Sequence, residues 1–219
     1  MSATTLLKDA SALKAASADD SPKRRQILSG ARQRFMDLGF DAASMSEIAR
    51  AAGVSKGTLY FYFADKAALF EAIVDEIAQA HGGIGQDLNP DSHDLATALT
   101  LYGTAYVQLL CRPEGGSAVR TVMAVAERMP EIGRLYYSKV VAGGIDRLAQ
   151  YLMTQSEAGL LDIDDHALAS EQFLKLCQAT LFLPFVFQAT SSPTSDRIAH
   201  VINGAVRMFL AAYQTEPKS

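Results

Sequence analysis

The stretch that follows residue 55 carries side chains of the kinds that contact nucleic acids: Lys56, Thr58, Tyr60, Tyr62 and Lys66. Lysine and threonine can reach base edges or phosphates, and tyrosine offers a hydroxyl to a phosphate and a ring face to a thymine methyl group. Gly57 lies among them, although glycine costs about 1 kcal/mol relative to alanine in a helix. That cost is understandable if the backbone must come close to another molecule here. The stretch therefore predicts a DNA-binding surface.

A second interpretation of the same stretch stays open. An aromatic run such as residues 60–63 usually belongs to a core, and we assign Phe63 and Phe61 there. Lys66 could be a solvated residue in the first turn of the next helix, rather than a phosphate ligand. The elements around the stretch decide between the two interpretations.

Two helices are predicted ahead of this stretch. The first spans residues 22–38, because Ser21 suits the N-cap and Gly39 suits the left-handed position after the last turn. The second begins after Ser44, whose hydroxyl and the carboxylate of Glu47 fit a capping box. Both helices can therefore be placed from local signals alone.

The second helix and a third, over residues 56–63, have the spacing of a helix-turn-helix. Ala49 is small enough to let two helices cross closely, and Gly53 tolerates the positive φ that the turn requires. Leu59 then fills the space between the helices. A fourth helix is predicted over residues 66–80. A third helix this short is marginal alone, so its neighbours must hold it and present it outward.

The charge distribution agrees with this assignment. The chain has a net charge of −4, but residues 21–66 hold eight basic and four acidic side chains. This segment therefore carries +4 and the remainder −8. A basic segment on an acidic body suits a phosphate-binding module attached to a different kind of domain.

The composition excludes several other classes of protein. The 219 residues are 49% hydrophobic, enough for a sizeable core. No apolar run reaches the roughly 18 residues of a membrane span, and residues 1–13 do not resemble a signal peptide, so we expect a cytoplasmic protein without a membrane partner. Cys111 and Cys177 are expected to be buried, reduced thiols. Without a catalytic, cofactor or metal-ligand motif, we expect no enzyme, no cofactor and no metal.

The chain from Arg24 to Ile73 resembles the DNA-binding domain of the TetR family of transcriptional regulators. The matching residues are Ile27-Leu28, Ala31, Phe35, Gly39-Phe40, Ser44-Met45, Ile48-Ala49, Ala52-Gly53-Val54-Ser55-Lys56-Gly57-Thr58-Leu59-Tyr60, Tyr62-Phe63, Lys66 and Leu69-Phe70. The resemblance implies an all-α dimer, a palindromic operator and a ligand-regulated C-terminal domain. It also implies base contacts by Lys56, Gly57, Thr58 and Tyr60, and phosphate contacts by Ser44, Tyr62 and Lys66.

The remainder of the chain is predicted to be helical throughout. After a glycine-rich break at residues 81–90, helices are expected over 94–111, 117–128, 132–157, 165–189 and 195–213. Pro184 should kink the fourth of these. Residues 127–132, followed by Leu135-Tyr136, resemble the AefR-like branch of the family, near the AcrR-type efflux regulators.

The last two predicted helices carry apolar stripes that could form a dimer interface. They comprise Phe173, Leu174, Cys177, Leu181, Phe182 and Phe185, and then Ile198, Val201, Ile202, Ala205, Val206, Phe209, Leu210 and Tyr213. Two such helices from each chain would make a four-helix interface, as the resemblance implies. The alternative is that these stripes are ordinary core within one chain.

Adaptable methionine and aromatic residues could also line a pocket for an apolar or amphipathic effector. The candidates are Tyr102, Tyr106, Met123, Tyr136, Met153, Phe173 and Cys177, and the alternative is again plain core. No charge pattern indicates an anionic or cationic effector.

These observations predict a three-part, all-α chain: an arm over residues 1–20, a helix-turn-helix domain over 21–66, and a helical regulatory and dimerisation domain over 67–219. The expected DNA contacts are Ser44, Ser55, Lys56, Gly57, Thr58, Tyr60, Tyr62 and Lys66. The expected function is a homodimeric repressor that leaves a palindromic operator when a small molecule binds. An activator and a sequence-indifferent architectural protein remain alternatives.

Overall fold

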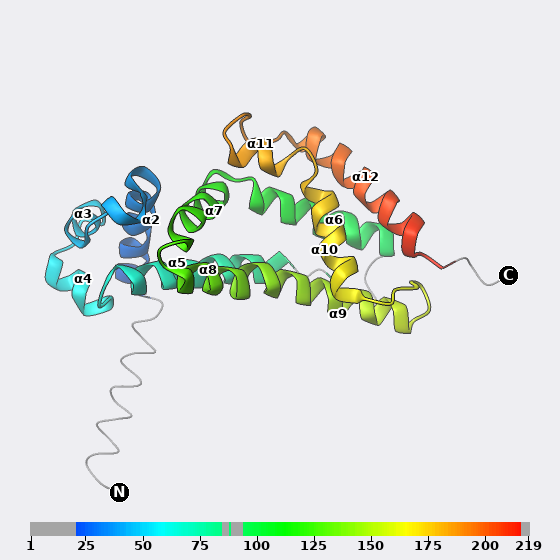
Figure 1. The fold of residues 1–219 in the computed structure, drawn as a ribbon, viewed down its shortest axis with the longest axis horizontal. Coiled ribbons are helices and arrows are strands. Elements are labelled where there is room, and N and C mark those ends of the chain that lie inside the picture. Colours follow the sequence, from blue (N-terminus) through cyan, green and yellow to red (C-terminus); the bar gives the residue numbers. More distant parts are fainter. Residues whose placement is uncertain (1–20, 85–87, 89–93, 216–219) are drawn as a thin grey trace, which may run out of the picture. The chain divides into compact units, whose positions relative to one another are not determined.

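The computed structural model describes residues 21–84, 88 and 94–215, without the side chains of residues 113–118. The described chain is helical and forms no strand, so the all-α prediction is confirmed. The predicted arm over residues 1–20 lies outside the described part. The chain divides into two compact units (Figure 1). The first unit holds the residues up to 73 together with 124–132, and the second holds 74–123 and those from 133 onward.

The first unit contains three N-terminal helices: α2 (Pro22–Ala42), α3 (Met45–Ala51) and α4 (Lys56–Tyr62). Ser21 caps α2 by accepting a hydrogen bond from the backbone N–H of Arg24. Gly39 has φ +79° and interrupts α2, as the sequence predicted, and a short helical turn follows it. The three rings of Phe35, Phe40 and Phe70 pack against one another beneath these helices, with centroids between 5.3 and 5.7 Å apart.

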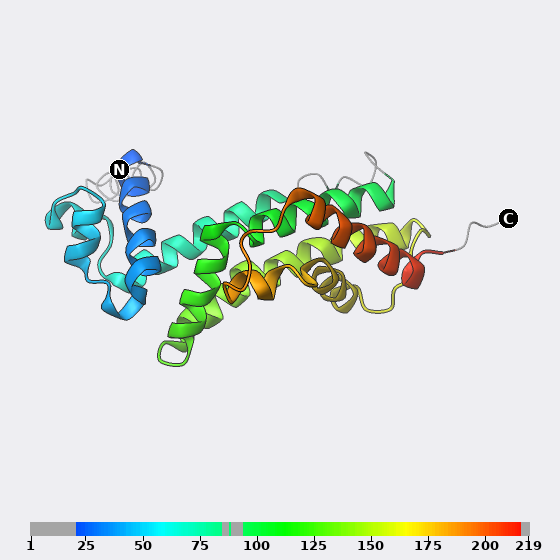
Figure 2. The same cartoon turned by 90° about the horizontal axis from the view of Figure 1, so that it is seen from above.

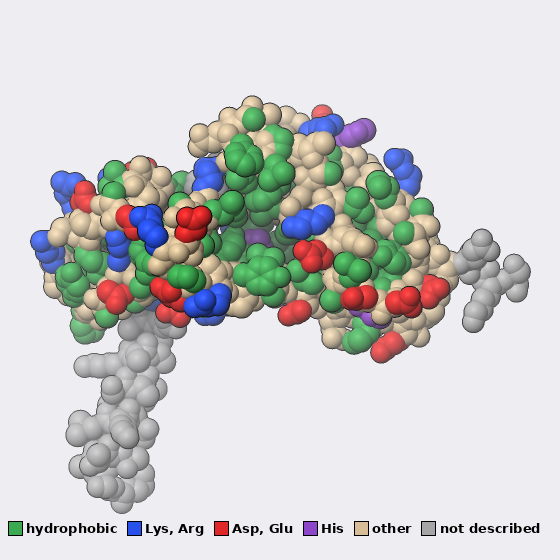
Figure 3. Space-filling model, in the orientation of Figure 1, with side chains coloured by type: hydrophobic (Ala, Val, Ile, Leu, Met, Phe, Trp, Pro, Cys, Tyr) green, Lys and Arg blue, Asp and Glu red, His purple; other side chains and the backbone are tan. Residues whose placement is uncertain are grey.

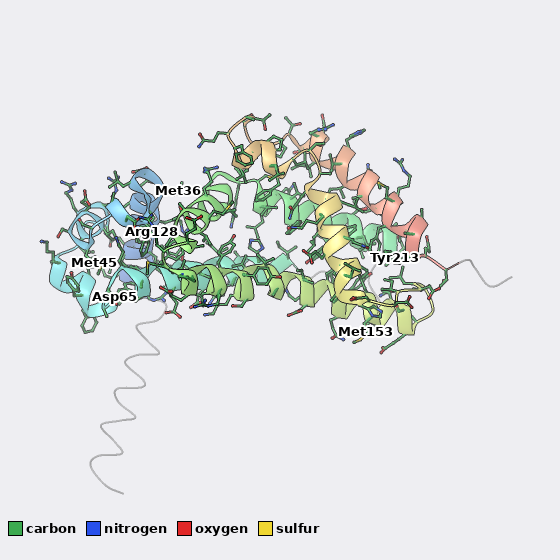
Figure 4. All side chains as sticks on the ribbon, viewed as in Figure 1. Met36, Met45, Asp65, Arg128, Met153 and Tyr213 are labelled. Carbon is green, nitrogen blue, oxygen red and sulfur yellow. The ribbon has the colours of Figure 1, made fainter. Side chains whose placement is uncertain are left out.

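Helix α5 (Lys66–Gly83) begins after Asp65, whose carboxylate accepts from the N–H of Ala68 at 2.8 Å (Figure 4). Its buried apolar residues in the first unit include Leu69, Phe70 and Ile73. Since α5 continues beyond residue 73, one helix belongs to both units.

The second unit is built mainly around α6 (Leu95–Leu110), α9 (Gly143–Glu157), α10 (His166–Gln178) and α12 (Ser195–Tyr213). Helix α10 packs against α9 and α12, and α12 also packs against α6 (Figure 2). Their apolar faces enclose fully buried side chains such as Leu99, Leu152, Phe173 and Ile202. Both cysteines lie in this core as free thiols, as expected.

Two further helices of the chain, α7 (Pro113–Ala126) and α8 (Pro130–Tyr136), run between the units along the sequence. Helix α8 continues into a π-helical segment, Tyr137–Ala142, and then directly into α9. The predicted helix over 132–157 is therefore one run of backbone, but with a π segment that the periodicity of the sequence did not indicate.

The predicted helix over 165–189 is wrong. Helix α10 ends at Gln178, Thr180 takes a positive φ of 61°, and a separate short helix, α11 (Phe182–Val186), follows. Pro184 is the third residue of α11, where a backbone N–H would have no helical partner, so it kinks nothing. Within residues 21–84 and 94–215, no helix is long and apolar enough to cross a bilayer.

Candidate DNA interface and effector cavity

The turn between α3 and α4 has the geometry that the sequence predicted. Gly53 adopts φ +60°, and the N–H of Val54 donates to the carbonyl of Ala49 at 3.0 Å. The side-chain amide of Gln26, on α2, donates to the carbonyl of Ala52 at 2.6 Å. These bonds satisfy carbonyls at the end of α3 and fix the direction in which α4 leaves the turn.

Gly30 on α2 was missed by the sequence reasoning, which assigned the close helix crossing to Ala49. A Cβ atom at Gly30 would lie 2.7 Å from the backbone nitrogen of Ala52 and 2.8 Å from its Cα. Backbone atoms cannot yield at such distances, so only glycine permits this approach of α2 to the end of α3. A lone glycine in an amphipathic helix gives no signal of its partner.

Helix α4 is held by its apolar side and exposes the opposite one. Leu59 and Phe63 are buried against the rest of the unit, whereas Lys56 and Gly57 are exposed and Tyr60 is 53% exposed. Phe61 is 79% exposed, so its assignment to the core was wrong. Only one flank of a seven-residue helix can face inward, and Leu59 and Phe63 already occupy it.

The N-cap of α4 is shared between two hydroxyls. Ser55 accepts from the N–H of Thr58 at 3.0 Å, and the two side-chain oxygens lie 2.8 Å apart. Gly57 has no positive φ, and a Cβ there would find only the Ser55 hydroxyl, at 3.8 Å. Nothing inside the described protein therefore requires glycine at this position.

The expected phosphate ligands have structural partners. Ser44 and Glu47 form the predicted capping box, and hydrogen bonds from Ser44 hold the pKa of Glu47 below its ordinary value. The hydroxyl of Tyr62 accepts from Ser21 at 3.2 Å, which leaves its own proton available to another acceptor. The Lys66 ammonium donates to the carbonyls of Phe40 and Asp41, at 2.6 and 3.0 Å.

Lys66 therefore stabilises the end of α2 in the free protein. Its ammonium also lies 4.6 Å from the ring centroid of Phe40. Two of its three N–H groups are engaged by carbonyls, and the third can still meet a phosphate. Lysine and arginine side chains lie at the surface of the α2–α4 part in Figure 3.

The segment 124–132 belongs to the first unit although the chain on either side of it belongs to the second. Arg128 in this segment forms an ion pair with Asp41, just after Gly39 in α2 (Figure 4). Both side chains are exposed, so the pair contributes little stability by itself. It does mark where the connection between α7 and α8 contacts the first unit.

The second unit contains a cavity of about 170 Å³. Three of the predicted pocket residues line it: Tyr102, Tyr106 and Tyr136. The others do not. Met123 is 65% exposed and Met153 is also on the surface (Figure 4), whereas Phe173 and Cys177 are fully buried in the core. Apolar character identified these positions as candidates but could not say which way each side chain faces.

Polar groups also line the cavity, and the sequence reasoning had assigned none of them to it. They are His81, Arg147, Glu171, Lys175 and Gln178. Gln178 donates to the hydroxyl of Tyr106, and the hydroxyl of Tyr102 donates to the carbonyl of Gly144 at 3.3 Å. These groups come from helices far apart in sequence, so no local spacing could reveal them.

Burial sets the protonation of the cavity lining. It raises the pKa of Tyr102 and of Tyr136 to about 12 and also raises that of Tyr106, so all three remain neutral near pH 7. Burial, together with the charges of Arg147 and Arg112, lowers the pKa of His81 to about 4. His81 is therefore a neutral imidazole near pH 7.

Two family models match the chain. The one described as "Bacterial regulatory proteins, tetR family" matches residues 27–73, and the "AefR-like transcriptional repressor, C-terminal domain" matches residues 97–215. The chain is 40% identical over 91 residues to the HTH-type transcriptional repressor Rv1474c of Mycobacterium tuberculosis, a match that covers 36% of this chain and 49% of that protein. It thus spans about half the length of this curated relative, and only 19% of the A-factor receptor protein of Streptomyces griseus.

Solved structures match over more of the chain. A TetR-family regulator from Mesorhizobium loti superposes with a TM-score of 0.80 at 26% identity, covering 88% of this chain and 97% of that one. The flavonoid-responsive regulator FrrA superposes with a TM-score of 0.71 at 34% identity, covering 89% and 98% of the respective chains.

Proposed function

The chain belongs to the TetR family of transcriptional regulators, with an AefR-like C-terminal domain, and from this we propose that it is a homodimeric repressor that releases a palindromic operator when a small molecule occupies the cavity. The observation that carries the DNA-binding part is the exposed side of α4. Leu59 and Phe63 anchor this helix, while Lys56, Gly57 and Tyr60 remain open to solvent.

In this proposal, α4 enters the major groove. Lys56, Thr58 and Tyr60 meet base edges, and the absent side chain of Gly57 lets the backbone approach the DNA closely. Ser44, Ser55, Tyr62 and Lys66 meet phosphates on either side. The free proton of the Tyr62 hydroxyl and the third N–H of Lys66 are the donors available for this.

A dimer is proposed because two recognition helices must sit about 34 Å apart, one DNA turn, to read a palindrome. Part of the apolar stripe on α12 is core within one chain, since Ile198, Ile202 and Phe209 are buried. The surface available to a partner subunit is the exposed apolar set Leu168, Leu183, Phe187 and Met208 on or beside α10, α11 and α12.

The effector response is proposed to act through elements that belong to both units. Helix α5 carries Lys66 at one end and the cavity residue His81 at the other. The chain between the cavity residues Val119 and Tyr136 carries Arg128, which pairs with Asp41. An effector that favours one arrangement of these elements would shift the population away from the DNA-binding state. Since FrrA is flavonoid-responsive, amphipathic aromatic compounds are the first effectors to test.

The test is selection of bound duplexes from a random DNA pool at about 150 mM salt, followed by titration of the selected sequence against a scrambled one. We expect a palindrome bound at least about 1000-fold more tightly than the scramble. Lys56→Gln should lower this preference about tenfold or more, whereas Lys175→Gln, in the second unit, should not change it. An absence of enrichment would instead support the architectural alternative, and transcription measured from the selected operator separates repression from activation.

A further inference from the structure

The cavity contains one cation that the protein leaves without an acceptor. Arg147, on α9, lines the cavity, and its Nε atom is buried without a hydrogen-bond partner among the described residues. Its guanidinium lies against the backbone of Gly143 and Gly144, where Cβ atoms would be 3.5 Å and 3.9 Å from its terminal nitrogens. A buried guanidinium N–H without an acceptor is costly, and a bound anion would remove that cost.

No other group in the cavity lining supplies a comparable charge. Glu171 and Lys175 carry opposite charges, are four residues apart on α10 and are exposed, so they form a rim that is neutral overall. His81 is neutral because burial and the charges of Arg147 and Arg112 hold its pKa at about 4. The half-buried charge that faces a bound molecule is therefore the positive charge of Arg147.

The rest of the lining is suited to a small ring or a short acyl chain. Leu174, Phe182 and Val140 supply apolar contacts, and the hydroxyl of Tyr106 accepts from Gln178 and can donate its own proton. The volume of about 170 Å³ is close to that of an apolar cavity of about 150 Å³ that holds one benzene molecule. A ligand of about ten non-hydrogen atoms fits this space.

We propose that the effector of this protein is a small amphipathic carboxylate, whose carboxylate binds the guanidinium of Arg147 while its ring or acyl chain lies among the tyrosines and Phe182. This inference rests on the proposed function, because it names the chemical class of molecule that the same cavity takes. A charge-assisted pair with arginine gives the site a preference for the acid over a neutral or cationic molecule of the same shape.

The experiment measures direct binding to the full chain, in the absence of DNA, by calorimetry. Two matched sets are used: benzoate, benzyl alcohol and benzylamine, and octanoate, octanol and octylamine. We expect the acid of at least one set to bind at least tenfold more tightly than its alcohol and amine. Equal or weaker binding of both acids would overturn the proposal.

Variants then locate the charge. Arg147→Gln should remove the tenfold preference for the acid while leaving binding of the alcohol unchanged, which also shows that the cavity is intact. Arg147→Lys should recover part of the preference, and Lys175→Gln, on the exposed rim, should keep all of it. An acid preference that survives in Arg147→Gln would overturn the assignment.

The outcome can be separated from that of the proposed function. If the acid binds through Arg147 but the operator stays bound, the present inference stands and the effector response of the proposed function fails. If the operator is released by neutral compounds regardless of Arg147, the effector response stands and the present inference is overturned.

Discussion

Replacing Gly57 by alanine should weaken DNA binding while slightly stabilising the fold. A Cβ at this position meets nothing closer than the Ser55 hydroxyl, at 3.8 Å, so alanine fits without strain. Alanine is favoured over glycine by about 1 kcal/mol inside a helix. Gly57 is the second residue of α4, so we expect about half of that and a rise in Tm of about 1–2 °C. The added methyl group would, however, occupy space that the proposed interface gives to the DNA.

The assay pairs thermal unfolding with titration of the selected operator. We expect Gly57→Ala to raise Kd at least about tenfold, which corresponds to about 1.4 kcal/mol. Gly82→Ala is the matched control, because Gly82 also lies in a helix, and a Cβ there would meet no atom within 4 Å. It should leave Kd unchanged. Operator binding by Gly57→Ala as tight as that of the unchanged protein would refute the idea that glycine serves close approach to DNA.

Three further predictions follow from the geometry. Gly30→Ala should destabilise the first unit by about 2 kcal/mol or more, because its Cβ would lie 2.7 Å from the nitrogen of Ala52, and unchanged denaturant unfolding would contradict this. His81 has a folded pKa near 4 against 6.5 unfolded, so the unfolded state binds its proton first and stability falls as pH drops below 6.5; the loss, about 1–2 kcal/mol at pH 5, should be absent in His81→Gln, as unfolding at pH 7.5 and pH 5 can check. Pro184→Ala should cost under about 1 kcal/mol, since the proline stands where the helix leaves an N–H unpaired; a loss of about 3 kcal/mol in the same assay would show that it holds a kink after all.

The helix-turn-helix could be predicted closely because its signals are local. The capping box of Ser44 and Glu47, the cap at Ser55 and the positive φ at Gly53 each depend on residues a few positions apart. Such interactions form the same way wherever the segment is placed. The contact of Gly30 with Ala52 spans 22 residues of sequence and has no such signature.

The cavity could be predicted only in part because packing between distant helices creates it. The aromatic type of Tyr102 and Tyr136 was a useful guide, but the same reasoning chose Met123, which faces solvent. Arg147 was overlooked because an arginine in an amphipathic helix normally lies on the solvated face. The break at Thr180 was missed because a non-glycine residue with positive φ is rare and leaves no compositional trace.

The π segment Tyr137–Ala142 also constrains how the length of this chain can vary. A π turn closes its hydrogen bonds over five residues instead of four, so the segment holds one residue more than an uninterrupted α-helix would need. Removing a single residue there would restore α-helical winding and rotate everything that follows by about 100°. Ile145 and Arg147 would turn away from the side that carries Tyr136. A one-residue deletion, with no change of side-chain chemistry, would thus rewrite which molecule the cavity can recognise.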